Sequence, residues 1–450
     1  MSRRVAVIGG GLAGIAAALR CADGGAQVTL FEGRPRLGGL THSFRRGDLD
    51  VDNGQHVFLR CCTSYLGLLD RLGVRDGVTL QPRLAIPIVS PGKNRVWLRR
   101  DALPAPAHLA RSLFAYTPLS VAERLRFITA ALALRRVDPD APATDAQSFG
   151  AWLTAHGQSR RAIETMWDLV GIATLNATAD DASLALAATV FQTGLLTKAS
   201  AADIGWSMVP LGELHGTAGQ RALSDAGVEV RTSARVSSVR RENGTWRIEG
   251  RSYDDVISAV PPEVASRILP PGVLPAGGTL GTSPIVNLHA VYDRKVLDEP
   301  FVAAIDSPLQ WVFDRTTQSG LTDGQYIAVS LSAADDLIDV PVAELRARLL
   351  PALEALLPAA RGAQLRDFFV TRERHATFRA APGTARLRPP GATSLPGLWL
   401  AGAWTATGWP ATMEGAVRSG DAAAAGVLDL PSAGRAASGS AMSTLDGAAI

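Results

Sequence analysis

The hydrophobic pattern changes its period several times along the chain, and each change marks a predicted element. An apolar run at residues 5–8 is followed by a helical pattern over 12–21 and by a second apolar run over 26–31. Short apolar runs that alternate with a helical pattern are typical of parallel strands joined by a helix. The first 32 residues therefore predict a βαβ unit.

Downstream, helical and strand patterns come in blocks. Helical patterns occur at 64–72, 108–115, 121–136, 149–156, 159–175, 342–357 and 412–428. Strand patterns, some of them broken by prolines, occur at 80–99, 227–236, 246–249, 255–260, 285–291, 309–313, 326–331 and 398–401. We expect the strands between 227 and 260 to return to the first sheet and those between 285 and 331 to form a second sheet.

This order predicts an α/β fold with a discontinuous Rossmann-like domain and a second, α+β domain. The Rossmann-like domain takes three segments, 1–79, 206–272 and 395–430, and the second domain takes 80–205 and 273–394. Residues 431–450 are rich in Ala, Ser and Gly. A tail of that composition buries too little apolar surface to fold, so we expect it to be disordered.

The helix predicted at 121–136 allows two interpretations. It follows Pro118 and Ser120, which suit a helix start, and its apolar residues extend most of the way round. Such a helix is either buried in a cap over the active site or lies on a membrane, with Arg124, Arg126, Arg135 and Arg136 at its polar edge. We favour the buried position, because large apolar side chains are usually inside.

A glycine-rich turn joins the first strand to the first helix. Gly9, Gly11 and Gly14 have the spacing G-x-G-x-x-G. The first glycine permits the tight turn, the second lets the backbone approach a pyrophosphate, and the third lets the helix pack closely on the sheet. Glu32 closes the second strand, eighteen residues after Gly14. An acidic side chain there accepts hydrogen bonds from a ribose, so the unit predicts a dinucleotide site.

Composition narrows the class of protein. With 450 residues, 47% of them hydrophobic and 19% charged, the chain is long and apolar enough for two folded domains. The 45 basic and 42 acidic residues give a net charge of +3. That balance is too even to indicate nucleic acid as a partner.

The cysteines and the longest apolar runs bear on location. Cys21, Cys61 and Cys62 are an odd number, and two of them are neighbours, which favours a reducing cytoplasm. The apolar runs fall short of the roughly 20 residues that span a bilayer. We therefore expect a cytoplasmic protein whose contact with the inner face of the cell membrane, if any, is peripheral.

Together these motifs resemble a known family. GGGLAG, Glu32, the RLGG doublet at residues 36–39 and LWLAGAWTATGWPATMEGAVRSG near the C-terminus are similar to the FAD-containing amine oxidase and phytoene desaturase superfamily. Within it, VDNGQHVFLRC, WDLVGIATLN, VPLGEL and TGWPATMEGAVRSG resemble the hydroxysqualene dehydroxylase family. The likeness runs to about Leu430. It implies an FAD enzyme that removes the hydroxyl of hydroxysqualene to give squalene, on the route to hopanoids.

The resemblance also implies which residues hold FAD. They fall into four groups: Gly9, Gly11, Leu12, Ala13, Gly14 and Glu32 at the adenosine diphosphate half; Arg36, Gly38 and Gly39 at the pyrophosphate; Gln55 beside the flavin and Val236 at the adenine; and Gly402, Trp409, Thr412 and Met413 at the ribityl chain and ring. One departure stands out. The family commonly has an acidic residue where this chain has Ala403, so a contact there is missing or replaced. Because no cysteine lies in the C-terminal half, we expect non-covalent FAD.

Loss of hydroxide requires a proton donor in an apolar site, because hydroxide is a poor leaving group. His56 is the first candidate, with Glu414 and Asp52 behind it; each of them could equally be a hydrogen-bonding support. Trp404 and Trp409 could stabilise a cation through their ring faces or serve only as packing. The sequence indicates no metal site.

Other functions remain open at this point. A carotenoid or phytoene desaturase would transfer hydride the other way on a similar isoprenoid, and a non-catalytic prenyl-binding protein would need no flavin. The intact glycine motif with Glu32 disfavours the non-catalytic prenyl-binding protein. The sequence does not identify the electron donor, since a second dinucleotide motif is not evident. Neighbouring squalene-pathway enzymes and a membrane surface are further candidate partners.

Overall fold

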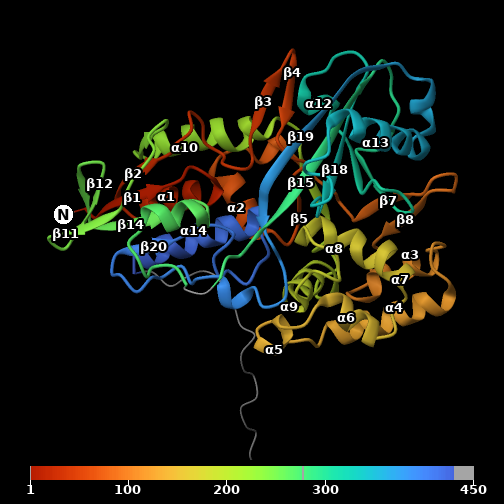
Figure 1. The fold of residues 1–450 in the computed structure, drawn as a ribbon, viewed down its shortest axis with the longest axis horizontal. Helices are drawn as coiled ribbons and strands as arrows, with labels where there is room; N and C mark the ends of the chain where they lie inside the picture. The colour runs from red at the N-terminus through yellow and green to blue at the C-terminus, as the bar shows by residue number, and fades with distance from the viewer. Residues whose placement is uncertain (1, 276–277, 430–450) are drawn as a thin grey trace, which may run out of the picture.

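A five-stranded parallel sheet carries the N-terminal glycine loop. The computed structural model describes residues 2–275 and 278–429. Its parallel sheet has the order β10-β2-β1-β14-β20 (Figure 1). These strands are β1 (Arg4–Ile8), β2 (Gln27–Phe31), β10 (Glu229–Arg231), β14 (Asp255–Ser258) and β20 (Leu398–Leu400). The predicted return of the chain to the first sheet is therefore confirmed at β10 and β14.

Two helices pack together against this sheet. They are α1 (Leu12–Asp23) and α14 (Met413–Val427), from opposite ends of the chain. A Cβ atom at Gly420 would lie 2.1 Å from the carbonyl oxygen of Ala13, so the two backbones approach as closely as a glycine allows. Small residues in both helices thus bring the two chain ends together.

The strand predicted at 227–236 is wrong in length. β10 ends at Arg231, and Ser233 adopts a left-handed φ of 53°. The N–H of Ala234 then donates to the carbonyl oxygen of Glu32 (2.9 Å) rather than continuing the sheet ladder. The predicted strand at 246–249 is β12 (Thr245–Ile248), which pairs with β11 (Arg240–Glu242) and β13 (Arg251–Tyr253) in a separate meander and not in the parallel sheet.

A seven-stranded, largely antiparallel sheet forms the second layer of the fold. Its order is β19-β15-β18-β17-β16-β7-β8, with a parallel pairing between β16 and β7. The strands are β7 (Ala85–Val89), β8 (Val96–Arg99), β15 (Thr282–Tyr292), β16 (Phe301–Ala304), β17 (Trp311–Asp314), β18 (Gln325–Ser332) and β19 (Leu365–Phe378). The helix α13 (Val342–Leu356) packs on one face through Leu345 and Leu349. This arrangement confirms the predicted α/β class with a second sheet.

A layer of helices packs at one end of the large sheet, at the lower right of Figure 1. They are α3 (Ala110–Phe114), α4 (Val121–Leu134), α5 (Pro142–Asp145), α6 (Phe149–Ala155), α7 (Arg160–Ala162), a π-helical turn (Ile163–Trp167), α8 (Asp168–Leu175) and α9 (Leu184–Phe191). Trp167 is buried among Phe127, Phe149 and Phe191. The indole N–H of Trp311 on β17 donates to the carbonyl oxygen of Leu169 (3.3 Å), which joins these helices to the sheet.

The favoured interpretation of the helix at 121–136 is wrong for its outer side. α4 ends at Leu134 and buries Ala130, Ala131 and Leu134, whereas Val121, Leu125 and Leu132 are exposed. The cause is geometric: α4 lies at the edge of the helical layer, so only one side of its apolar surface meets other helices.

Shorter elements connect the layers. They are the hairpin β3 (Ser43–Arg46) and β4 (Leu49–Asp52), the sheet β5 (Val57–Leu59), β9 (Ile204–Ser207) and β6 (Val78–Leu80), and the helices α2 (Thr63–Arg71), α10 (Ala218–Asp225), α11 (Pro262–Ile268) and α12 (Thr316–Ser319). Among the described residues, none of the helices has the length and apolarity to cross a bilayer. The predicted domain limits remain predictions, and the tail at 431–450 lies outside the described residues.

Candidate FAD and active site

The glycine loop after β1 has the geometry of an anion site. Gly9 has a left-handed φ of 107°, and its N–H donates to the carbonyl oxygen of Phe31 (2.7 Å). A Cβ atom at Gly14 would lie 1.8 Å from the carbonyl oxygen of Gly9. α1 then begins at Leu12, and its N-cap, Gly11, has no side chain to bond the first-turn N–H groups. These N–H groups of Leu12, Ala13 and Gly14, with the positive end of the helix dipole, suit a pyrophosphate.

Glu32 lies at the end of β2, directly beside this loop. Its carboxylate accepts hydrogen bonds from the N–H groups of Gly10 (2.7 Å) and Arg34 (2.8 Å). The side chain is therefore held at the mouth of the loop, where the sequence predicts a ribose contact. Val236, the predicted adenine contact, is buried in the irregular segment that follows β10.

The RLGG doublet packs on the glycine loop. Gly38 and Gly39 have left-handed φ values of 97° and 58°, and a Cβ atom at Gly39 would lie 2.9 Å from Cα of Gly11. The Arg36 guanidinium donates to the carbonyl oxygen of Gly39 (3.3 Å). Burial, and then the nearby Arg34, lowers the pKa of Arg36. A phosphate beside this group would relieve the repulsion between the two guanidinium groups.

The C-terminal motif forms a second loop, between β20 and α14. Gly402 donates its N–H to the Ser419 hydroxyl (2.7 Å), and the Thr412 hydroxyl caps α14 by accepting from the Gly415 N–H (3.1 Å). Thr412 is thus already engaged in capping. Trp409 is partly buried, with the Arg418 guanidinium 4.7 Å from its ring centre, and Met413 follows in the first helical turn.

A buried arginine that the sequence did not indicate occupies the region of Ala403. Arg388 donates to the carbonyl oxygen of Ala403 (3.1 Å), to that of Thr405 and to the Thr407 hydroxyl (3.1 Å). Burial lowers the pKa of this guanidinium to about 10. Backbone carbonyl groups therefore bind this arginine where a carboxylate at position 403 would offer a charged partner.

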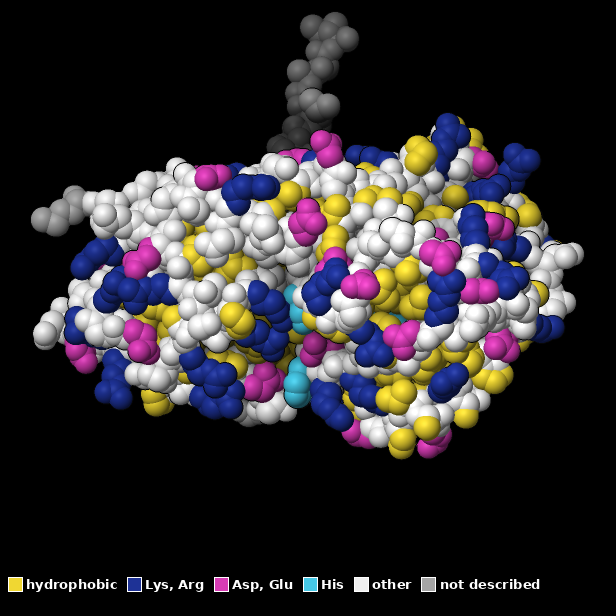
Figure 2. Space-filling view, turned by 90° about the horizontal axis from the view of Figure 1, so that it is seen from above, with side chains coloured by type: hydrophobic (Ala, Val, Ile, Leu, Met, Phe, Trp, Pro, Cys, Tyr) yellow, Lys and Arg dark blue, Asp and Glu magenta, His cyan; other side chains and the backbone are white. Residues whose placement is uncertain are grey.

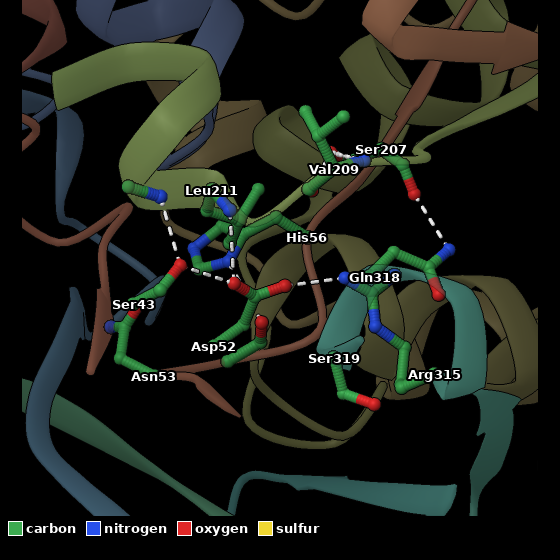
Figure 3. Close-up of polar contacts among 12 residues, drawn as sticks. Ser43, Asp52, Asn53, His56, Ser207, Val209, Leu211, Arg315, Gln318 and Ser319 are labelled. Atoms are coloured by element: carbon green, nitrogen blue, oxygen red, sulfur yellow. Dashed lines mark hydrogen bonds and ion pairs between the residues drawn. The ribbon is translucent and has the colours of Figure 1, made fainter. Parts of the chain in front are cut away.

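Asp52 is the centre of a buried hydrogen-bond cluster (Figure 3). Its carboxylate accepts from the Ser43 hydroxyl (2.6 Å) and the Leu211 N–H (2.9 Å), and it forms an ion pair with Arg315. Asp52 and Arg315 are each only 5% exposed. The pair joins β4 to the residue that precedes α12, so it links the β3–β4 hairpin to the large sheet.

His56 lies two residues after Gly54 in the same segment (Figure 3). The ring is half-buried, and Nδ1 is 3.2 Å from the carbonyl oxygen of Gly54. Burial lowers the pKa of His56, Asp52 opposes this effect and Arg315 adds to it. The rings of His42 and His215 are also close enough to interact with it electrostatically.

Glu414 joins two helices. It is 1% exposed, and its carboxylate accepts from the N–H groups of Ser64 (3.2 Å) and Tyr65 (2.8 Å) at the start of α2 and from the Arg418 guanidinium (2.6 Å). Because the Glu414 carboxylate accepts three hydrogen bonds, these contacts favour a structural role between α2 and α14 over proton donation. The Asp52 carboxylate also accepts three hydrogen bonds, which favours a structural role for it as well.

Several buried polar atoms in this region have no hydrogen-bond partner. They include Oε1 of Gln55, Oδ1 of Asn287 and Oε1 of Gln318. Asn287 on β15 reaches the segment through Nδ2, which donates to the carbonyl oxygen of Asn53 (3.3 Å). A buried polar atom is normally satisfied, so these atoms fit a site that binds a polar group. Trp404 differs, because its indole N–H donates to the carbonyl oxygen of Val260 (3.1 Å) and its ring lies in the core, which favours packing.

Three features therefore fit FAD: a glycine loop at a helix N-terminus, glycines at which a Cβ would block the backbone approach, and buried amide oxygens without hydrogen-bond partners. Together they define a flavoprotein oxidoreductase of the Rossmann type.

The chain matches the model of the family described as flavin containing amine oxidoreductase over residues 12–428. It belongs to that family, and it is an FAD-dependent oxidoreductase.

Curated relatives match over almost the full length. The chain is 28% identical to hydroxysqualene dehydroxylase from Sinorhizobium fredii, over 94% of this chain and 98% of the relative, and 28% identical to that from Rhodopseudomonas palustris, over 97% and 100%. It is 24% identical to zeta-carotene desaturase from Synechocystis sp., over 94% and 97%. These relatives indicate an oxidoreductase that acts on isoprenoids.

Solved structures share the fold. A putrescine oxidase triple mutant superimposes with a TM-score of 0.72 at 20% identity, over 95% of this chain and 99% of that one. An oxidoreductase from Methanosarcina mazei gives 0.70 at 17% identity, over 95% and 100%. Both comparisons support the Rossmann-type architecture with its second sheet.

Proposed function

We propose that the protein is a hydroxysqualene dehydroxylase, which reduces the allylic alcohol of hydroxysqualene to squalene with FAD. One observation carries the choice: of the three candidate proton donors, Asp52 and Glu414 accept hydrogen bonds from arginines, whereas His56 is bonded to a carbonyl oxygen. A reductive dehydroxylation needs a donor at this place, because the C–O bond breaks as hydroxide accepts a proton and leaves as water. The 28% identity to two dehydroxylases over nearly the whole chain supports it.

Each residue then has a role in the reaction. Reduced FAD, when bound, supplies hydride to the substrate carbon. The imidazolium of His56 would donate its Nε2 proton to the departing oxygen, with Nδ1–H bonded to Gly54. Asp52 and Arg315 hold the loop that carries His56, and the aromatic side chains of Phe301 and Trp311 on the large sheet pack with Trp206 of β9 into an apolar cluster. We propose that FAD is non-covalent, since Cys21 and Cys62 are buried and the C-terminal half has no cysteine.

A desaturase is the second candidate, because the zeta-carotene desaturase likeness also spans the chain. That reaction removes hydrogen and needs no acid for a leaving hydroxyl. The two functions therefore predict different products from the same protein.

The test is anaerobic incubation of the purified, chemically reduced holoenzyme with hydroxysqualene, followed by product identification. We expect squalene together with oxidised FAD in equal amounts. The matched control is the oxidised holoenzyme incubated with phytoene. A product with more double bonds than phytoene in that control, with no squalene in the first reaction, would overturn the proposal in favour of the desaturase.

A further inference from the structure

The outer side of α3 and α4 is an unusually apolar surface. Among the described residues, nine large hydrophobic side chains are exposed, and five of these lie between positions 103 and 132. Their exposed fractions are 50% for Leu103, 58% for Phe114, 65% for Val121, 52% for Leu125 and 42% for Leu132. We call Phe114, Val121, Leu125 and Leu132, with the arginines described below, the α3–α4 face. Apolar side chains scattered singly are ordinary, but such a group marks an interaction surface.

The helix geometry gathers these side chains on one side. Val121, Leu125 and Leu132 are spaced by four and seven residues, so they share one side of α4. The opposite side packs inward through Ala130, Leu134 and Phe127, whose ring is 4.5 Å from that of Trp167.

Arg124 places the end of α3 beside the same side of α4. Its guanidinium donates to the carbonyl oxygens of Phe114 and Leu119 (2.8 Å to the latter). Figure 1 shows both helices at the outer edge of the molecule, far from the parallel sheet. The exposed side of α4 and the end of α3 thus form one continuous face.

The charge of this segment is strongly positive. Residues 103–136 contain five arginines, at 111, 124, 126, 135 and 136, and one carboxylate, Glu123; Asp101, Asp138 and Asp140 flank this stretch. That net charge of +4 exceeds the +3 of the whole chain. Glu123 is engaged in the helix cap, where it accepts from the N–H of Ser120 (2.8 Å) and the hydroxyl of Ser159 (2.6 Å). By contrast, the face in Figure 2 shows basic and acidic side chains interspersed.

We propose that the α3–α4 face binds the anionic surface of a lipid bilayer. Apolar side chains flanked by arginines match the boundary between acyl chains and phosphate headgroups. A second copy of the chain fits less well, because two faces of charge +4 would repel each other. Nucleic acid would leave the apolar side chains of Val121 and Leu125 against phosphates. The inference goes beyond the proposed function and rests on the surface alone, whichever isoprenoid is the substrate.

The test compares vesicles of phosphatidylcholine with vesicles that also contain phosphatidylglycerol, in a sedimentation assay of the full-length holoenzyme. We expect binding to the anionic vesicles that weakens as NaCl is added, because salt screens the arginines. The variant Val121→Asp/Leu125→Gln removes two apolar side chains and adds a negative charge, so it should lower the partition coefficient by about tenfold or more.

Val342→Asp is the matched control. Val121 and Val342 are each the first residue of a helix and are exposed, but Val342 begins α13 on the large sheet. An aspartate at either position is favoured by the helix dipole, so both variants should fold and retain FAD. The control should bind vesicles like the parent protein.

Two results would overturn the proposal: a parent protein that stays in the supernatant with both kinds of vesicle, or a double variant that binds as well as the parent. A dimer that the double variant dissociates, seen by light scattering without vesicle binding, would instead assign this face to self-association. Turnover of detergent-dispersed hydroxysqualene is measured in parallel. Vesicle binding without squalene would refute the proposed function and leave the lipid-binding face intact.

Discussion

His56 differs from the two neighbouring carboxylates in the chemistry that its contacts leave open. Asp52 and Glu414 each accept three hydrogen bonds, including one from an arginine. The ring of His56 has a carbonyl oxygen at Nδ1, and in the proposed reaction Nε2 would carry the proton for the departing oxygen. Burial lowers the pKa of His56 below its usual 6.5, so the ring is mostly neutral at neutral pH.

This pKa direction predicts how the rate depends on pH. Only the protonated ring can act as an acid, so kcat/KM for dehydroxylation should rise as the pH falls from about 8 to about 6. The charged or titratable groups around the ring are Asp52, Arg315, His42 and His215. His56→Gln keeps a polar side chain but cannot act as an acid. It should slow squalene formation by about 10²–10⁴-fold and flatten the pH profile.

The control for this variant is a measurement of its FAD content and of the rate at which that FAD is reduced. His56→Gln should retain FAD and its rate of chemical reduction, both followed by absorbance. Turnover within a few-fold of the parent, with the pH profile unchanged, would show that His56 only supports the loop.

The sequence predicts site residues most readily where the predicted role depends on local spacing. The glycines at 9, 11 and 14, Glu32 and the RLGG doublet act within one βαβ unit, so their order along the chain carries the signal. Arg315 lies 263 positions from Asp52, and Asn287 reaches Asn53 across the two sheets. Such contacts depend on the packing of distant elements, which leaves no pattern along one segment. Arg388 was missed for the same reason.

At the scale of elements, the contact between α1 and α14 brings together the glycine loop before α1 and the C-terminal loop before α14. Gly420→Ala would place its Cβ 2.1 Å from the carbonyl oxygen of Ala13, which is backbone and cannot move aside alone. We expect the variant to lose about 1–3 kcal/mol of unfolding free energy and to release FAD more readily. Urea unfolding and flavin release on dilution are the measurements.

Gly67→Ala is the matched control for this change. Gly67 is an exposed residue within α2, and a Cβ atom added there would have no heavy atom within 4 Å. At this position alanine should stabilise the helix by up to about 1 kcal/mol. If both substitutions had the same effect, close packing of α1 on α14 would not be the cause.

Long apolar strands were predicted, whereas the short central strand β16 and the edge strand β19 were not. β15 and β18 are buried central strands and showed apolar runs. β19 lies at the edge of the sheet, and its sequence LRDFFVTRERHATF mixes charges with apolar residues, as edge strands do. α4 was correctly predicted as a helix but wrongly as buried. A hydrophobic pattern along the sequence does not distinguish side chains in the core from apolar side chains on the surface.

For the whole molecule, buried histidines predict sensitivity to acid. Burial lowers the pKa of His215 and of His289 to about 3 each. His289 is held as a neutral ring between the Tyr326 hydroxyl (2.7 Å) and the Thr371 hydroxyl (3.0 Å). Below pH 6.5 these two histidines bind protons in the unfolded chain but stay neutral in the folded protein. The free energy of unfolding therefore decreases as the pH falls.

The expected loss from these two rings is on the order of 4 kcal/mol of unfolding free energy between about pH 7.5 and about pH 5, which is about 2 kcal/mol per ring. Asp168 opposes it in part, because burial raises its pKa to about 6 and the folded state then gains a proton. Urea unfolding at a series of pH values measures the slope, and His289→Asn should reduce it. Stability that stayed constant or rose towards pH 5 would contradict this account.

The meeting of α1 with α14 has a consequence for the order of synthesis. α1 ends at residue 23 and α14 begins at residue 413, so the ribosome makes nearly the whole chain between them. At about 5–20 residues per second, that interval lasts on the order of 20–80 s. β20, the neighbour of β14, also emerges only in this last part. During synthesis, α1 therefore lacks its packing partner until translation is almost complete, and the loops before α1 and α14 come together only then.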